Sequence, residues 1–478
     1  MKPIKNLFIY LVPSLVSAVI PIITLPIFTR ILTVEDYGIY ALGIVYGTFV
    51  SGIANFGLTI GYERNFFENK ETKEKQGALL FSVLLFVVCT FILFGVITFL
   101  FKSKIASWII GNVKWGDLIL LSYCAVGISS LKMYYLTYFK NTNNAKLFAW
   151  YSIDETILNV VFSFLLIYFF HSGVTGLILG QLIGSSIVFF ILTVKFFRSF
   201  SFQPNLSLLK SCLNISLPLT PRIFFGVIGN QFDKYMINLL GSVGGVGVYN
   251  LGQKVSYVVF NFMTAIQNVN SPHVYDLMFK KGEQGGQEIG KYLTLPLYIS
   301  AFIGLCVSLF SEEIILILTP SSFHGAVDII TVLSLLYVTY FFGKQPQLIY
   351  AKKTAITSYL TILGIVLNVF INIPFIKYWG AEGAAYGTLL AGILSSTVTF
   401  YYSQKFFNIV WEYEKIVYIF LSLFVFAFVI IFLRKLEVLY YIRLIVKLLF
   451  GSLYLLLGFN FNIINKELFY KLKQQISK

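Results

Sequence analysis

Apolar stretches of about 20 residues recur from one end of this chain to the other. A helix of that length spans the hydrocarbon core of a bilayer. Of the 478 residues, 57% are hydrophobic and only 12% are charged. This leaves too little polar surface to cover a core in water, so we expect the bilayer to be the solvent of the chain.

The stretches predict an all-α polytopic membrane protein with about fourteen spanning helices. Their approximate bounds are 7–29, 37–61, 77–101, 116–139, 147–170, 173–195, 212–233, 244–270, 292–318, 326–350, 354–377, 380–404, 414–433 and 440–460. The first stretch is too long for the core of a signal peptide and lacks a cleavage site of small residues. We therefore expect it to remain as a helix.

The second half of the chain repeats the first. The run Tyr37–Gly43 (YGIYALG) reappears about 209 residues later as Val246–Gly252 (VGVYNLG). Ile157–Val161 (ILNVV) likewise reappears as Val366–Phe370 (VLNVF), and a third match pairs Gly173, Gly176 and Gly180 with Gly380, Gly383 and Gly387. Six helices per half is an even number, so the two copies insert the same way up, as parallel repeats.

The repeat divides the chain into three parts. We predict a first six-helix lobe over residues 1–205, a second over 206–410, and two further helices with a tail over 411–478. In transporters built from repeats, the substrate site lies near the bilayer midplane where the repeats meet. The repeat therefore indicates a transport function.

The net charge of +15 follows the expected membrane topology. Lys and Arg are concentrated in alternate connections, beginning with the N-terminus and ending with the C-terminal tail. By the positive-inside rule these connections and both termini face the cytoplasm. Two connections on the opposite side depart from the rule: 102–115 carries Lys102, Lys104 and Lys114, and 434–443 carries Arg434, Lys435 and Arg443.

The connections are too short for a catalytic or nucleotide-binding domain, since none exceeds roughly 20 residues. We therefore predict that the protein is not an enzyme and that an ion gradient, the membrane potential or the substrate's own gradient supplies the energy. The three histidines and four cysteines lie apart in sequence, without the spacing of metal ligands. We expect no metal site and no cofactor.

A polar stripe runs along the stretch 244–270. Its members recur at intervals of three and four, the spacing of one helix face; they are Asn250, Lys254, Tyr257, Asn261, Thr264 and Asn268. Lipid would not accept this face, so it faces other helices or a hydrated cavity. Asn55 belongs to the corresponding stripe of the stretch 37–61, and hydrogen bonding between helices is the alternative reading of both.

Four cations lie inside apolar stretches: Lys132, Arg222, Lys254 and Lys344. Lys132 and Lys344 occupy matching places in the two halves, each eight residues before a second lysine, and Tyr340 extends the face around Lys344. A buried charge without a partner is costly. An anionic ligand such as a diphosphate would offset that cost through charge-assisted hydrogen bonds. The alternative is that each cation pairs with a neighbouring carboxylate or backbone carbonyl.

The run Thr29–Tyr40 (TRILTVEDYGIY), which follows the proline-rich first stretch, resembles the R-x-L-x-x-x-x-[FY]-G-x-Y element of the polysaccharide flippases. These proteins form the Wzx-like, polysaccharide transport branch of the MOP exporter superfamily, which also contains the MATE exporters and the lipid II flippases. The G-x-x-G-x-x-x-G series at Gly173 and Gly380 resembles the family as well, and the resemblance covers nearly the whole chain.

The resemblance implies two V-shaped lobes that alternate between inward-open and outward-open states. The cargo would be an undecaprenyl-diphosphate-linked oligosaccharide, moved from the cytoplasmic to the outer leaflet of the bacterial inner membrane for O-antigen or capsule synthesis. Polymerase and chain-length proteins of the same pathway would be partners, and nucleic acid would not. The two additional helices would help form a groove for the lipid tail.

Carried onto this chain, the four cations would line the cavity that holds the diphosphate. Arg30, Glu63 and Arg64 would lie near the rims, and Asp233 and Glu155 are the candidates for coupling to Na⁺ or H⁺.

Two other functions remain open. A MATE-like multidrug exporter would need acidic cavity residues, whereas these are basic. A membrane O-antigen polymerase or ligase would need a long outer loop, and these loops are short.

Overall fold

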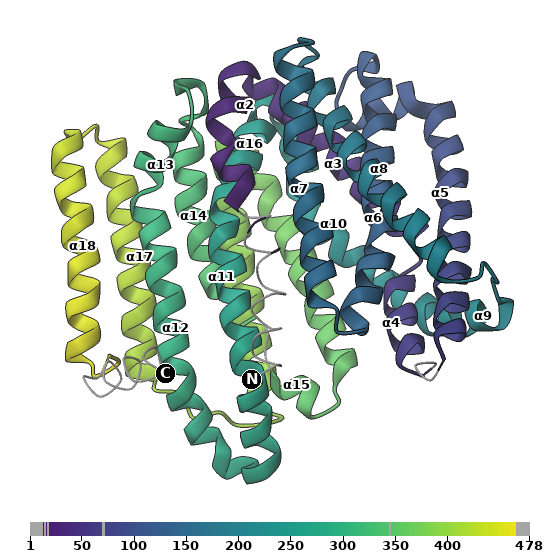
Figure 1. The fold of residues 1–478 in the computed structure, drawn as a ribbon. Coiled ribbons are helices and arrows are strands. Elements are labelled where there is room, and N and C mark those ends of the chain that lie inside the picture. The colour runs from purple at the N-terminus through teal and green to yellow at the C-terminus, as the bar shows by residue number, and fades with distance from the viewer. Residues whose placement is uncertain (1–12, 14–15, 17–18, 69–71, 344–345, 465–478) are drawn as a thin grey trace. The chain divides into compact units, whose positions relative to one another are not determined.

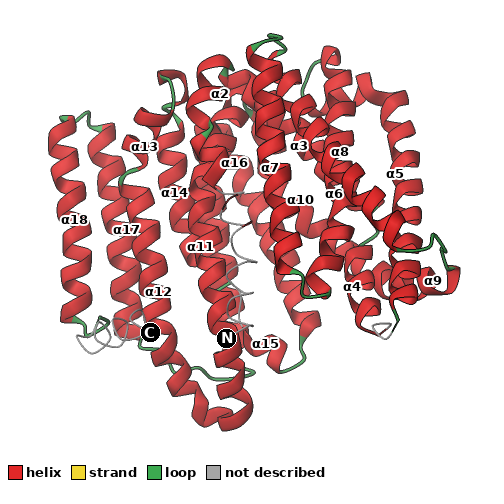
Figure 2. Ribbon diagram, in the orientation of Figure 1, coloured by secondary structure: helices red, strands yellow, loops and turns green. Residues whose placement is uncertain are grey.

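The computed structural model describes residues 13, 16, 19–68, 72–343 and 346–464. Throughout this part every regular element is a helix (Figure 2). The all-α fold predicted from the apolar stretches is therefore confirmed. The first predicted span, 7–29, is described at residues 13, 16 and 19–29, which are helical except at Thr24.

Among the described residues, each predicted stretch has helices at its place (Figure 1). In the first half these are α2 (Leu25–Ile31), α3 (Val34–Ala54), α4 (Leu58–Glu68), α5 (Lys73–Ile109), α6 (Gly116–Asn141), α7 (Ala145–Tyr168) and α8 (Gly173–Ser199). In the second half they are α9 (Leu206–Ser216), α10 (Thr220–Leu240), α11 (Val243–Lys281), α12 (Gly285–Leu309), α13 (Ser311–Leu318), α14 (Ala326–Thr339), α15 (Pro346–Tyr350) and α16 (Thr354–Gln404). The chain ends with α17 (Tyr413–Lys435) and α18 (Tyr440–Asn460).

Within the described residues, nine helical segments are long and apolar enough to cross a membrane. Two of these, Val243–Leu309 with 67 residues and Ala355–Gln404 with 50, are each long enough for two crossings. The first contains α11 and α12, and the second contains α16, which is interrupted at Gly380. The chain is therefore a multi-pass membrane protein.

Backbone packing divides the chain into two compact units, and the division falls within α11. One unit comprises Met1–Leu251 with Ile376–Ala381, and the other comprises Gly252–Phe375 with Glu382–Lys478. The first unit includes the start of the second sequence copy, because α9 packs on α4 and α10 packs on α3. The boundaries at 205 and 410 describe the sequence repeat, and they stay a prediction.

The repeated glycine of the YGIY and VGVY runs has a packing role inside the first unit. A Cβ atom on Gly38 would lie 1.9 Å from the carbonyl oxygen of Val243, and one on Gly247 would lie 2.0 Å from that of Val34. Val34 and Val243 are themselves repeat equivalents, so the contact is reciprocal, as at a two-fold axis. The two glycines let α3 and α11 cross with their backbones in contact.

The TRILTVEDYGIY run also fixes where α3 begins. The Thr33 hydroxyl accepts a hydrogen bond from the Asp36 backbone N–H at 3.1 Å, and the Asp36 carboxylate accepts one from the Thr33 backbone N–H at 2.9 Å. This reciprocal pair is a capping box, which satisfies two N–H groups that the first turn leaves unpaired. The motif therefore combines a helix start with the glycine at the crossing.

The G-x-x-G-x-x-x-G series has the same geometry in both copies. Gly173 and Gly380 both have a positive φ, of 52° and 56°, in the left-handed region that favours glycine. Gly180 and Gly387 are close-packing positions. A Cβ atom on Gly180 would lie 2.2 Å from the Ser163 backbone nitrogen, and one on Gly387 would lie 2.2 Å from the Asn372 amide oxygen.

Most cations of the two connections that depart from the positive-inside rule have partners. Lys102 pairs with Asp117 at 2.5 Å, while Lys104 and Lys114 lie over the rings of Trp108 and Trp115. At the other connection, Arg434 pairs with Asp328 at 2.5 Å and Arg443 with Glu312 at 2.5 Å, while Lys435 lies 3.9 Å from Glu382. Each of these cations therefore has a neighbouring carboxylate or aromatic ring, and the orientation of the chain stays a prediction.

The last helix is held to α13 by an ion-pair cluster that we call the α18 clasp: Glu312, Glu313, Arg443 and Lys447. Lys447 is fully buried and contacts Glu312 at 2.8 Å and Glu313 at 2.7 Å. The α17–α18 pair also packs on α12 (Figure 1). Because two cations of α18 pair with two carboxylates of α13, the clasp holds α18 against α13 within the second unit.

Candidate functional site

All six residues of the predicted polar stripe lie on the single continuous helix α11. Asn250 is 3% exposed, Tyr257 is 44% exposed and Asn268 is exposed, while Lys254, Asn261 and Thr264 are half-buried. Within the described part of the chain, Asn250 Nδ2 and Thr264 Oγ1 are buried with no hydrogen-bond partner. Buried polar atoms in this state call for a water or a ligand, so the stripe stays a proposed lining for a hydrated cavity.

An aromatic cluster of the second unit surrounds Tyr257. Its ring centroid lies 4.8 Å from that of Phe260 and 5.7 Å from that of Tyr337, which stands edge-on at 86°. The ring centroid of Tyr337 lies 6.0 Å from that of Tyr340, the predicted neighbour of Lys344. These contacts join the stripe on α11 to α14 and to the residue that follows it.

Lys132 lies in a buried ion pair with Glu155 inside the first unit. Lys132 is 1% exposed, and the Glu155 side chain is 13% exposed. Ser129 on α6 and Ser185 on α8 donate hydrogen bonds to Glu155 Oε1 at 3.1 Å and 2.9 Å. Three helices thus hold one carboxylate against the lysine. For Lys132 this is the alternative expected from the sequence, in which a buried cation pairs with a neighbouring carboxylate.

The two halves differ at this point. The offset that matches ILNVV to VLNVF pairs Glu155 with Gly364, so the second copy has no carboxylate at the position that neutralises Lys132. A Cβ atom on Gly364 would lie 2.6 Å from the Ser395 hydroxyl, which shows that this helix face is closely packed. Lys344, the counterpart of Lys132, lies outside the described residues. Arg222 lies on α10, and its side chain is not among those described.

The remaining predicted residues take separate places. Glu63 pairs with Lys140 at 2.9 Å and Arg64 with Glu68 at 2.6 Å. Arg30 is exposed in the last turn of α2. Asn55, which follows α3, accepts a hydrogen bond from the Tyr134 hydroxyl.

The second candidate for ion coupling, Asp233, is 4% exposed and accepts a hydrogen bond from Tyr249 at 2.9 Å. In the described part of the chain, no group of three or more His, Cys, Asp and Glu residues is arranged to hold a metal ion.

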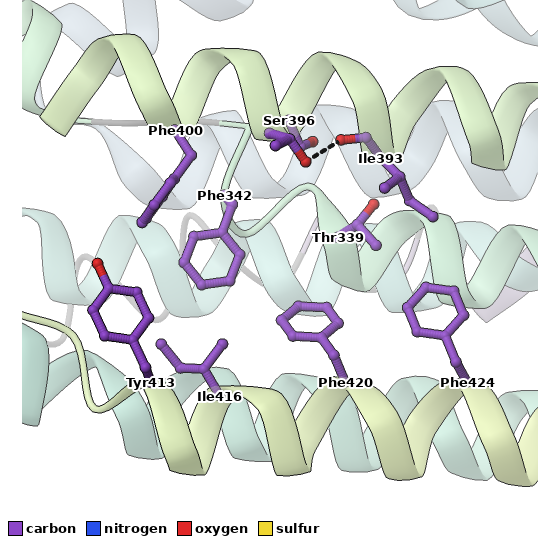
Figure 3. Close-up of a pocket in the computed structure, with 10 residues that line it drawn as sticks. Thr339, Phe342, Ile393, Ser396, Phe400, Tyr413, Ile416, Phe420 and Phe424 are labelled. Atoms are coloured by element: carbon purple, nitrogen blue, oxygen red, sulfur yellow. Dashed lines mark hydrogen bonds between the residues drawn. The ribbon is translucent and has the colours of Figure 1, made fainter.

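An apolar pocket of about 340 Å³ opens in the second unit, and sequence reasoning did not find it. Figure 3 shows its aromatic side chains pointing into one space from three segments. The lining residues are Thr339, Phe342, Ile393, Ser396, Thr397, Phe400, Tyr413, Ile416, Phe420 and Phe424. Phe420 and Phe424 stand one turn apart on α17, the first of the two additional helices. The lining suits a hydrocarbon chain.

The fold defines the class of protein first. Aligned with a solved structure titled "Lipid II flippase MurJ, inward closed conformation", the chain has a TM-score of 0.74 over 96% of its own length and 100% of that chain. At 14% identity the likeness shows the fold alone. It is the fold of the MOP-type membrane transporters, as predicted.

The sequence comparisons then give the family. Residues 4–277 match the family model described as "Polysaccharide biosynthesis protein", and the chain belongs to this family. The probable low-salt glycan biosynthesis flippase Agl15 of Haloferax volcanii is 24% identical over 221 residues, 45% of this chain and 46% of that protein. Lsg locus putative protein 1 of Haemophilus influenzae is 23% identical over 403 residues, 80% of this chain and 96% of that protein.

The chain thus matches less than half of the length of the Haloferax relative. The family match and the fold together indicate a polysaccharide biosynthesis protein with the fold of membrane transporters. They do not support the polymerase or ligase alternative.

Proposed function

We propose that this protein moves an undecaprenyl-diphosphate-linked oligosaccharide from the cytoplasmic to the outer leaflet of a bacterial inner membrane, by alternating access. The observation that carries the proposal is the polar stripe on α11. It combines a cation, hydroxyl and amide groups and an exposed aromatic ring within a membrane-spanning helix. Such a helix face suits the charged, hydroxyl-rich head group of a lipid-linked sugar.

In this proposal Lys254, Arg222 and Lys344 bind the diphosphate. Lys132 is not among the diphosphate ligands, because it already pairs with Glu155. The absence of a carboxylate at Gly364 supports leaving the charge of Lys344 for the substrate. Transport itself requires no bond to be made or broken, only differential binding to two states.

The apolar pocket supports the lipid part of the proposed substrate. Its lining of Phe, Ile and Tyr side chains suits a polyisoprenoid chain, and hydrocarbon burial contributes roughly 0.8 kcal/mol per CH₂ group. The sugar would then stay in a hydrated space while the tail stays in an apolar one. We further propose that both termini are cytoplasmic and that Glu155 or Asp233 couples transport to H⁺ or Na⁺.

A MATE-like exporter of cationic drugs is less well supported. The two acids proposed for ion coupling each have a described partner, Lys132 for Glu155 and Tyr249 for Asp233. The α11 stripe carries a lysine and no acid. An anionic substrate therefore fits the charges better.

Reconstitution in liposomes tests the proposal. Exposure of a fluorescent undecaprenyl-diphosphate saccharide on the far leaflet would be followed for wild type, Lys254→Ala and Lys344→Glu. Lys280→Ala is the matched control, because Lys280 lies on the same helix with its side chain 72% exposed and paired with Asp276. We expect both cavity variants to slow flipping with normal insertion. Rates equal to those of wild type and Lys280→Ala would reject the cationic site.

A further inference from the structure

Tyr257 differs from the other aromatic rings of its cluster in its exposure. Its side chain is 44% exposed, whereas Tyr337 behind it is 5% exposed. Tyr257 is also the one ring of the α11 stripe, three residues after Lys254 and four before Asn261. Residues at these spacings share one helix face.

Two aromatic rings contact the ring of Tyr257. Phe260 lies at 4.8 Å with the rings tilted by 36°, and Tyr337 meets it edge-on at 5.7 Å. Phe260 and Tyr337 contact each other at 5.5 Å, so the supporting rings are themselves fixed. A ring that is held by two neighbours and is still 44% exposed is a rigid platform with few rotamers to lose on binding.

Such a platform suits a sugar ring. One face of a pyranose presents several C–H bonds, which carry partial positive charge and pack against the electron-rich face of an aromatic ring. The hydroxyl groups lie around the edge of the sugar, where amide groups can hydrogen-bond them. Asn261, one turn further along α11, supplies such an amide.

The spacing on α11 matches the order of groups in the proposed substrate. With a rise of 1.5 Å per residue, Tyr257 lies about 4.5 Å and Asn261 about 10.5 Å along the helix from Lys254. A diphosphate bonded to the first carbon of a sugar places its phosphates within about one helical turn of the sugar ring. Charge, ring and amide thus follow one another as phosphate, sugar face and hydroxyl groups do.

We propose that Tyr257 is the stacking platform for the sugar bonded to the diphosphate, with Lys254 holding the phosphates and Asn261 hydrogen-bonding the hydroxyl groups. The proposal rests on the proposed function and adds to it a sugar subsite. Stacking reads the C–H face of the ring rather than each hydroxyl. The first sugar is therefore recognised by ring shape, and sugars with a similar C–H face are accepted.

The test compares two probes, undecaprenyl diphosphate with and without a saccharide, and two variants, Tyr257→Phe and Tyr257→Leu. Leucine retains an apolar side chain and removes the ring. Tyr359→Leu is the control, because Tyr359 lies on α16 with 73% exposure. Binding to detergent-solubilised protein is measured by retention on a filter, and flipping is measured in liposomes.

We expect Tyr257→Phe to bind both probes like wild type. Tyr257→Leu should weaken binding of the saccharide probe between about twofold and tenfold and leave the sugar-free probe unchanged. Equal loss for both probes would show a structural role, and no loss for the saccharide probe would exclude stacking. Failure of the wild type to flip either probe would reject the proposed function, while the binding comparison would still decide whether Tyr257 recognises the sugar.

Discussion

Replacing Glu155 by Gln removes the negative charge that faces Lys132 and keeps nearly the same shape. The amide oxygen can still accept the hydrogen bonds of Ser129 and Ser185, while Lys132 loses both the negative charge and the oxygen that it faced. The Lys132 side chain is 2% exposed and cannot reach water instead. Breaking such a buried pair on one side costs about 3–5 kcal/mol, because the remaining charge is left without a partner.

The chain offers a matched control in the pair of Arg64 and Glu68, whose side chains are 59% and 58% exposed. Because water screens this pair, Glu68→Gln should cost at most about 1 kcal/mol. The double variant Lys132→Met with Glu155→Gln removes both buried charges and should regain most of the stability lost by Glu155→Gln alone.

The melting midpoint of the detergent-solubilised protein measures these differences. A thiol-reactive dye is suitable, since Cys212 is a buried free thiol that becomes accessible on unfolding. Equal midpoints for Glu155→Gln and Glu68→Gln would refute the reasoning. So would a double variant as unstable as the sum of the single changes.

Transport by the double variant then separates two roles. If Lys132 serves only the packing of α6 against α7, the stable double variant flips its substrate like wild type. Loss of flipping at normal stability would instead return Lys132 to the substrate site.

Three further predictions follow from the packing. Gly38→Ala should greatly reduce the yield of folded protein, because the added Cβ would meet the backbone oxygen of Val243. Gly226→Ala is the control and should leave the yield unchanged, since nothing lies within 4 Å of the added carbon. The height of the monodisperse peak in size-exclusion chromatography measures the yield of each variant. Lys447→Met should lower the melting midpoint, because Glu313 loses its ion pair while Glu312 keeps Arg443, and Glu313→Gln in the same chain should restore part of it. Thr397→Phe should fill the apolar pocket and slow the flipping of an undecaprenyl probe while sparing one with two isoprene units; equal slowing of both would refute the lipid role.

Much of the fold could be predicted because its cause is local. An apolar stretch of membrane length must be helical wherever it packs, since lipid offers no partner for backbone groups. The repeated glycines could be found by sequence comparison for the same reason, because each satisfies a local need: a positive φ at Gly173 and Gly380, and a close crossing at Gly38 and Gly247.

The candidate site was predictable only where its residues share one helix. The stripe from Asn250 to Asn268 follows from a spacing of three and four residues. The pairing of Lys132 with Glu155 depends instead on how α6, α7 and α8 pack, and no spacing in the sequence encodes that. The pocket was missed for a similar reason, because its lining comes from segments far apart in the chain.

The α18 clasp and the pair of Arg434 and Asp328 bear on how much of the chain could be dispensed with. Truncation before α17 would delete the cations and leave Glu312, Glu313 and Asp328 without their ion-pair partners. A shortened twelve-helix form would therefore need neutral replacements at those acids before it could insert stably. These three acids and the helices α17 and α18 thus depend on each other, and we expect neither to be lost without a change in the other.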